Sequence, residues 1–489
     1  MTLVEKTKIL LLSIFNLLFI GTFSYVFINA TVFPNTFVET MNPWVVLIIA
    51  IVIGLILFGA YRLLRQLSKK SLIIISCLNF LIFLALQLFF FKYFQLTPTW
   101  DVGVIYREAL NHKDYIGELS SYFTVRYPNN IPLLLAEIYG VRILDFLGID
   151  NYYKVFTFLN IVLVLCSMGG LYWFSYRRVG IIGATWGSFL MLFITPLYMY
   201  TPIFYTDTLV MPFVIFGVLL YDIFYQSTHK FRYLWVILMS ILLTIGVLFK
   251  ANVIILVIAI FIHYVMTRNY KQWLSFIGIF IVPFMLINFV YQQLVTPLYP
   301  VEKSELGFPA THWIMMGTYG NGSYYEEDVQ FTESLKVDQK LSNEEIEKVH
   351  LEVIKERLMG DGVQGFIKHI NRKLNFTWAE GTYFAVPLLN RQPVDDNMFR
   401  DYVYGEARKP YIYFCQAVQL NIIGMLVVAG FKLFKRKSVF EIVLSLTVFG
   451  TFLFLLIWET RSRYLVLILP VMMALCTYAM CDKNNELKG

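Results

Sequence analysis

Long apolar runs separated by short polar turns dominate the pattern of this chain. A membrane-crossing helix needs roughly 20 apolar residues, and about twelve runs approach that length. They cover residues 9–28, 44–60, 71–91, 155–174, 181–200, 209–225, 233–249, 253–266, 273–290, 411–431, 439–457 and 464–480. The pattern therefore predicts an all-α polytopic membrane protein.

The apolar stretch 233–266 is longer than one span, and Lys250 and Asn252 interrupt it. As a single helix it would extend about 50 Å at about 1.5 Å per residue. Because the hydrocarbon core is only about 30 Å thick, we expect two short passes that turn at Lys250.

Lysine and arginine set the expected orientation, since cytoplasmic loops are enriched in both. With the N-terminus inside, every short basic turn falls on the same side. These turns hold Arg62, Arg65, Lys69, Lys70, Arg177, Arg178, Lys230, Arg232, Arg268, Lys271, Lys432, Lys435, Arg436 and Lys437. The first run lacks a small-residue cleavage pattern, so we expect a retained anchor. The sequence predicts a plasma-membrane protein, of bacterial type, with both termini cytoplasmic.

Two long segments, 92–154 and 291–410, then lie on the extracytoplasmic side. The first contains NNIPLLLAEIYGVRILDFLG, which carries Glu137, Arg142 and Asp145 and predicts an amphipathic helix at the membrane surface. It also contains DVGVIYREALNH, a shorter helix for which we expect Asp101 as the N-cap.

The second segment contains LSNEEIEKVHLEVIKERLMG, where Ser342 and Glu345 have the spacing of a capping box. This predicts a helix outside the membrane. We divide the chain into a membrane module at 1–293 that includes the loop 92–154, an extracytoplasmic region at 294–410, and C-terminal membrane helices at 411–489.

Composition narrows the function classes. Hydrophobic residues make up 58% of the chain and charged residues 15%, which excludes an ordinary soluble enzyme. The net charge of +7 reflects basic cytoplasmic turns, so we expect no nucleic-acid partner. The five cysteines show neither CxxC nor Cys/His metal spacing. We therefore predict no cofactor, with a divalent metal left open.

Polar residues gather at the predicted outer edge. Carboxylates there can act as general bases, and lysine and arginine can hold a phosphate. We predict Asp101 and Asp207 as catalytic, and a substrate- or phosphate-binding set of Lys250, Arg463, Arg461, Arg126, Tyr127 and His312. Structural alternatives remain: the aspartates as helix caps, Lys250 as a snorkelling residue, the arginines as membrane anchors or partners of Glu459, and His312 as a packed loop residue.

Several stretches resemble the GT-C superfamily of polyprenyl-phosphate-sugar glycosyltransferases, such as the protein O-mannosyltransferases and the aminoarabinose transferases. They are TPTWDVGVIY, RYPNNIPLL, PIFYTDTL, LFKANVIILV and RSRYLVLILP. The resemblance implies acidic residues at the positions of Asp101 and Asp207 and a lysine at the helix turn of Lys250. It departs from the family in having two spans before the span that leads to Asp101, and in placing the large outer segment before the last three spans.

We therefore expect an inverting glycosyltransferase in the lipid bilayer. Its donor would be a polyprenyl-monophosphate sugar, and its acceptor a cell-envelope glycan, glycolipid, teichoic acid or protein. Two alternatives stay open: a lipid-linked sugar flippase or transporter, which usually carries mid-membrane charge and paired interrupted helices, and a polymerase or ligase that acts on diphosphate-linked glycans.

Overall fold

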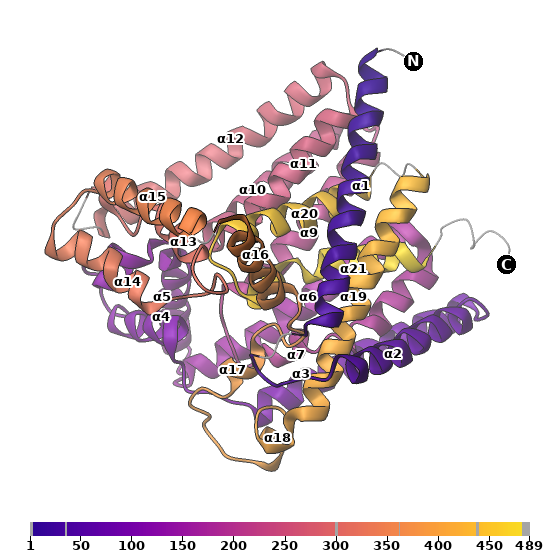
Figure 1. The fold of residues 1–489 in the computed structure, drawn as a ribbon, viewed down its shortest axis with the longest axis horizontal. Coiled ribbons are helices and arrows are strands. Elements are labelled where there is room, and N and C mark those ends of the chain that lie inside the picture. The colour runs from indigo at the N-terminus through magenta and orange to yellow at the C-terminus, as the bar shows by residue number, and fades with distance from the viewer. Residues whose placement is uncertain (1–2, 35–36, 299–301, 361, 437–439, 482–489) are drawn as a thin grey trace.

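A computed structural model describes residues 3–34, 37–298, 302–360, 362–436 and 440–481. The described residues form helices joined by turns, with one isolated β-bridge between Leu96 and Pro393 (Figure 1). Nine helical segments in these ranges are long and apolar enough to cross a membrane, and two more apolar helices are shorter. The predicted all-α polytopic membrane fold is confirmed.

The membrane helices follow the predicted runs closely. They are α1 (Leu3–Val32), α2 (Pro43–Leu64), α3 (Lys69–Tyr93), α6 (Tyr152–Leu190), α8 (Thr206–Leu209) with α9 (Met211–Gln226), α10 (Tyr233–Phe249), α11 (Ile254–Thr267), α12 (Tyr270–Val295), α19 (Lys409–Arg436), α20 (Ile442–Ile457) and α21 (Leu469–Met480). The run 233–266 divides into α10 and α11, because Lys250 has extended backbone angles of −153° and 109°. The predicted turn at Lys250 is present.

Helix α6 contains the predicted run 155–174 and the first half of the run 181–200, whose second half forms a turn and α7 (Pro196–Met199). Gly180 interrupts it with φ 80° and ψ −176°, a conformation open essentially only to glycine. The chain reverses there, since the Asn160 side chain donates a hydrogen bond to the carbonyl of Tyr200 at 2.8 Å. In a straight helix those residues would be about 60 Å apart at about 1.5 Å per residue.

The two long segments between membrane helices are helical as well. The first contains α4 (Trp100–Asn111), η1 (Tyr122–Arg126), η2 (Pro128–Asn130) and α5 (Ile131–Phe146). The second contains α13 (Ala310–Gly317), α14 (Glu326–Glu333), α15 (Asn343–Gly360), α16 (Gly362–Trp378), α17 (Ala385–Leu389) and α18 (Met398–Asp401). The capping box of α15 is present: Ser342 N donates to Glu345 Oε2 at 2.9 Å, and Glu345 N donates to Ser342 Oγ at 3.3 Å.

The region 294–410 packs in two ways. Phe308, Met316 and Val329 form a small apolar core under α13 and α14. Leu374 and Trp378 of α16 and Leu388 of α17 belong instead to the main core shared with the membrane helices. The latter part of this region is therefore built into the body of the molecule.

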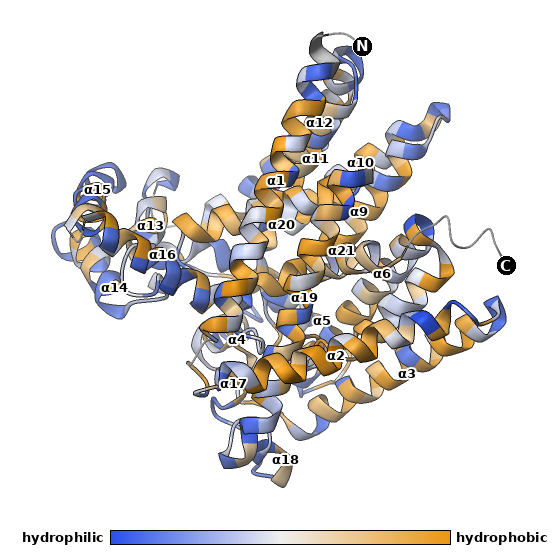
Figure 2. Cartoon of the chain, turned by 45° about the vertical axis from the view of Figure 1, so that its right-hand side comes forward, coloured by the Kyte–Doolittle hydropathy of each residue, from blue (hydrophilic) through white to orange (hydrophobic). Residues whose placement is uncertain are grey.

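The basic turns meet at one end of the bundle. Lys8, near the start of α1, donates to the carbonyl of Arg268 after α11 at 3.1 Å. Arg177 Nε lies 2.9 Å from Asp222 Oδ2, and Lys432 donates to the carbonyl of Cys481 at 2.6 Å. Figures 1 and 2 show both termini away from α13–α15 and α18. The long segments therefore cover the other end.

Apolar side chains cover the outside of the bundle, as a protein in lipid requires. Figure 2 shows α2, α3 and α12 as largely hydrophobic along their length. Leu55, Leu81 and Val282 are examples, with exposed fractions of 65%, 62% and 67%. The lipid bilayer is therefore the environment of this chain.

Candidate functional site

Asp101 lies at the end of the bundle covered by the long segments, in the first turn of α4. The predicted N-cap role is wrong: Thr99 is the N-cap residue, and Asp101 lies inside the helix. Tyrosine hydroxyls donate to its carboxylate instead, Tyr122 to Oδ1 at 2.8 Å and Tyr205 to Oδ2 at 3.5 Å. Because its side chain is 29% exposed, the carboxylate remains open to an incoming group.

Arg463 brings a positive charge beside this carboxylate. Its Nη2 atom lies 3.9 Å from Asp101 Oδ2. The guanidinium also lies over the rings of Trp100 at 4.9 Å and Tyr205 at 5.6 Å, contacts that favour a cation. Its Nε atom is buried without a hydrogen-bond partner, so this arginine retains an unused donor.

Asp207 and Lys250 form an ion pair next to this group. The side chain of Asp207 is fully buried and that of Lys250 is 11% exposed. The ammonium of Lys250 also lies 5.4 Å from the ring of Tyr464. Since Tyr205 is near in sequence to Asp207 and also contacts Asp101, the two predicted catalytic acids share one neighbourhood.

Two further arginines complete what we call the charged cluster, formed by Asp101, Asp207, Lys250, Arg391, Arg461 and Arg463. Arg391 lies 5.8 Å over Trp100, and Arg461 lies 4.4 Å over Phe384. Burial, and then the charges of Arg461 and Arg463, lower the pKa of Arg391. Burial also lowers the pKa of Arg461, with Arg463 acting in the same direction. Cations held this close favour an anionic ligand.

Strained backbone surrounds the cluster. Five described residues other than glycine have positive φ, and four of them flank it: Trp100 at 46°, Tyr383 at 52°, Phe384 at 62° and Gln392 at 40°. Such conformations cost about 1–3 kcal/mol each and concentrate at functional sites. Trp100 precedes Asp101, Phe384 lies under Arg461, and Gln392 follows Arg391, so each strained turn sets the position of a charged residue.

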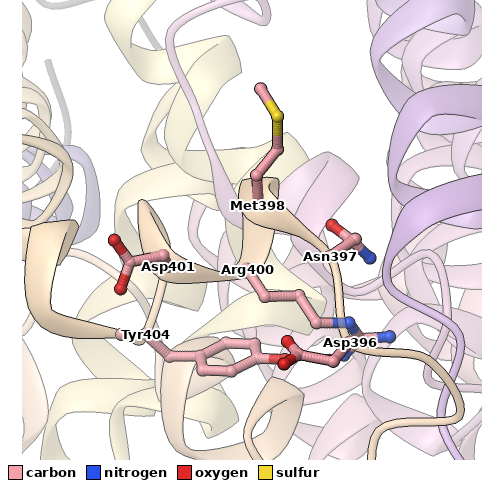
Figure 3. Close-up of a pocket in the computed structure, with 7 residues that line it drawn as sticks. Asp396, Asn397, Met398, Arg400, Asp401 and Tyr404 are labelled. Carbon is pink, nitrogen blue, oxygen red and sulfur yellow. The ribbon is translucent and has the colours of Figure 1, made fainter.

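A short clamp holds the segment that leads to Asp101. Residues 392–394, which precede α18, pair with residues 95–97. Thr97 N donates to the carbonyl of Gln392 at 3.0 Å, and Val394 N donates to the carbonyl of Gln95 at 3.0 Å. A cavity of about 400 Å³ lies next to this clamp, since Arg400 donates to the carbonyl of Gln95 at 2.9 Å. The cavity is lined by Asp396, Asn397, Met398, Arg400, Asp401, Tyr404 and Gly405. Figure 3 shows Arg400 and Tyr404 side by side there, and no residue of the charged cluster lines this cavity.

Three predicted site residues lie outside the cluster. Arg126 forms a two-bond ion pair with Glu333, at 3.0 and 2.5 Å. Tyr127 lies against the rings of Tyr122 and Trp313, at 4.9 and 5.6 Å. Tyr127 therefore adjoins Tyr122, which donates to Asp101.

His312 packs inside the unit formed by α13–α15. It is fully buried, and its Nδ1 atom lies 2.7 Å from the hydroxyl of Thr332. Burial, followed by the charge of His350, lowers the pKa of His312 to about 3. At neutral pH this histidine is uncharged and distant from solvent, in line with the structural alternative.

Sequence reasoning missed several members of this neighbourhood: Tyr122, Asn130, Tyr205, Arg391 and Tyr464. Tyr464 donates to buried Glu459 at 2.5 Å. Glu459, the predicted alternative partner of the arginines, therefore belongs to the same region. The chain has 32 tyrosines, so the three tyrosines among them do not stand out by type. The motifs RYPNNIP and RSRYLVLILP contain two of the five, Asn130 and Tyr464, and only their position beside quoted site residues could have indicated a role.

The comparisons with known proteins give a family and no activity. A family model described as a conserved hypothetical integral membrane protein matches residues 3–483, and the chain belongs to this family. No curated protein and no solved structure matches it. Among the described residues, no group of three or more His, Cys, Asp or Glu side chains has an arrangement that could hold a metal ion.

Proposed function

We propose that this protein is a membrane glycosyltransferase of the GT-C type, which moves a sugar from a polyprenyl-monophosphate donor to a cell-envelope acceptor. The observation that carries the proposal is the convergence of an accessible carboxylate with an excess of cations. Four cations face two aspartates in the charged cluster and buried Glu459 beside Arg461, and Asp207 is already paired with Lys250. A phosphate is the anion that such an excess favours.

The proposed reaction needs one base and one phosphate site. Asp101 accepts the proton of an acceptor hydroxyl, whose oxygen attacks the anomeric carbon of the donor sugar. A new C–O bond forms as the bond between that carbon and the phosphate oxygen breaks, with inversion. The phosphate leaves with the bonding electrons, and Arg463, Arg461 and Arg391 stabilise the charge that grows on it. Asp207 fixes Lys250 at the same place.

Position in the membrane agrees with a lipid-borne donor. The charged cluster lies where α10 turns into α11 and just before α21, at the end of the bundle remote from the basic turns. Cytoplasmic ends carry the basic excess, so we assign the cluster to the extracytoplasmic face. A polyprenyl chain can then lie along the apolar helices while its phosphate reaches the arginines.

The first test measures binding of undecaprenyl phosphate, a polyprenyl monophosphate of the kind that leaves in the proposed reaction, to the purified protein in nanodiscs. We expect Arg463→Ala to weaken binding by tenfold or more, since a charge-assisted hydrogen bond contributes about 1.5–3 kcal/mol. Arg65→Ala, an exposed arginine at the opposite end, is the control and should bind normally. Preference for undecaprenyl diphosphate over the monophosphate would contradict the proposed donor.

The second test measures turnover with radiolabelled polyprenyl-phosphate hexoses and pentoses, using cell-envelope membranes as acceptor. Asp101→Asn should bind the phosphate lipid and lose transfer by about 10²–10⁴-fold, the usual contribution of a general base. Full transfer by Asp101→Asn would remove the base from the proposal.

A further inference from the structure

A closed ring of hydrogen bonds surrounds the carboxylate of Asp101. Tyr122 donates its hydroxyl to Oδ1 at 2.8 Å, and the Asn130 side-chain nitrogen donates to the oxygen of Tyr122 at 2.8 Å. Tyr205 closes the ring, with Asn130 Oδ1 at 3.3 Å and Asp101 Oδ2 at 3.5 Å. Asn130 is 3% exposed and Tyr205 5%, so both side chains are fixed by packing.

The two tyrosines differ in what they can do. The Tyr122 oxygen receives the Asn130 amide, which leaves its proton for Asp101. Burial, and then the charge of Asp101, raise the pKa of Tyr122, which therefore stays protonated. Tyr205 has one proton and two acceptors within reach, Asp101 and Asn130. Its hydroxyl can turn from one to the other without movement of the ring.

This asymmetry distinguishes the two oxygens of Asp101. Oδ1 is held by the short bond from Tyr122, while Oδ2 faces the longer contacts of Tyr205 and of Arg463 at 3.9 Å. An ionised carboxylate favours a hydroxyl that points toward it, and a protonated one needs that acceptor less. The more weakly bound Oδ2 is the oxygen available to a proton.

We propose that Asn130 is a positioning residue that lets Asp101 change its protonation state: Tyr205 donates to ionised Asp101, and turns to Asn130 when Oδ2 has taken a proton. The inference rests on the proposed function, because that reaction supplies the proton from the acceptor hydroxyl. The O–H bond of the acceptor breaks, the O–H bond on Oδ2 forms, and the Tyr205 proton stays on its own oxygen throughout.

Other titratable groups around Asp101 do not take this role. Arg463, Arg461 and Arg391 act on it as fixed positive charges, as their mutual electrostatic influence indicates. Tyr127, between η1 and η2, and Tyr324, just before α14, are near enough that, after burial, the charge of Asp101 contributes to raising the pKa of each. Tyr122 also contacts both Asp101 and Asn130, but its oxygen receives the Asn130 amide and its proton goes to Asp101. Among the described hydrogen bonds, Tyr205 is the one hydroxyl that has both Asp101 and Asn130 as acceptors.

The test follows protonation of Asp101 by infrared difference spectroscopy of the full-length protein in nanodiscs, without donor. The carboxyl C=O band that disappears in Asp101→Asn identifies the group. Tyr205→Phe, which removes one hydroxyl from the ionised form, should raise the pH at which half of the band appears by about one pH unit. Tyr115→Phe is the matched control, since Tyr115 is 79% exposed on the same segment, and should leave the midpoint unchanged.

Asn130 is tested in a Tyr122→Phe background, which removes its contact with Tyr122. There Asn130→Leu should lower the midpoint, because Tyr205 loses its alternative acceptor and must donate to Asp101. The same change should have no effect once Tyr205→Phe is added, a dependence that a merely structural role would not produce. If Asn130→Leu does not fold, the midpoint of Tyr205→Phe still tests the inference, because an unchanged midpoint contradicts it.

An unchanged midpoint in Tyr205→Phe, or an Asn130→Leu effect that persists without the Tyr205 hydroxyl, would overturn this inference. Neither outcome bears on phosphate binding or on the activity of Asp101→Asn. Conversely, normal transfer by Asp101→Asn would rule out Asp101 as the base of the proposed function, and the measured dependence of its protonation on Tyr205 and Asn130 would still stand. The two failures are therefore distinguishable.

Discussion

At the residue scale, the two aspartates of the site differ in how far they are exposed to solvent. Asp101 is partly exposed and has a long ion contact, whereas Asp207 is fully buried and tightly paired with Lys250. Removing one charge of a buried ion pair is strongly destabilising, because the other charge is left buried without a partner. Asp207 thus holds Lys250 in place, and Asp101 is the acid that the proposed reaction uses.

This difference gives a prediction for stability. Asp207→Asn should lower the free energy of unfolding by about 3–5 kcal/mol, the usual cost of leaving one buried charge unpaired. Adding Lys250→Met to Asp207→Asn should restore most of the loss, since both charges are then removed. This restoration is measured by thermal unfolding in detergent of the two single variants and the double variant. A double variant no more stable than Asp207→Asn would contradict the pairing.

The sequence predicted the charged residues of the cluster better than the neutral ones. Asp101, Asp207, Lys250 and Arg463 could be assigned to one edge because each lies at the predicted outer end of an apolar run. Asn130, Tyr122 and Tyr205 act through contacts with one another and with Asp101, between residues up to 104 positions apart in the chain. Their roles depend on geometry that no local pattern contains.

At the element scale, chain reversals are the features on which the site depends. Run lengths predicted the division at Lys250, because a span has a fixed thickness to cross. They also predicted two passes on either side of Gly180, which the structure joins into one helix with a sharp break. The N-cap of α4 was misassigned, because Thr99 and Asp101 are both residues that cap helices and spacing alone does not separate them.

Gly180 offers a test of that reversal. Its φ of 80° with ψ of −176° belongs to a region that is essentially restricted to glycine. Gly180→Ala should therefore destabilise the protein by about 1–3 kcal/mol. Gly169→Ala in the same helix is the matched control, since a methyl group there meets nothing within 4 Å, and it should be neutral or stabilising. Equal thermal stability of the two variants would show that the break at Gly180 tolerates a side chain.

At the scale of the whole molecule, the two ends of the bundle have different chemistry. One end collects the basic turns, and the other collects the charged cluster together with α4, α5 and α13–α18. This separation follows from the sequence alone, because alternate turns between spans are basic. The packing of α16 and α17 into the main core does not, since the region 294–410 reads as one continuous segment between spans.

The separation predicts the topology of the chain in the membrane. Single cysteines are placed at Glu344, at the start of α15, and at Ser68, in the turn between α2 and α3; both positions are exposed. The five native cysteines are replaced to remove background. In intact cells, a membrane-impermeant maleimide should label Glu344→Cys and leave Ser68→Cys unlabelled until the cells are opened, because basic turns are typical of the cytoplasmic side of membrane proteins. Labelling of Ser68→Cys in intact cells would place the charged cluster on the cytoplasmic face, where an extracytoplasmic acceptor could not reach Asp101.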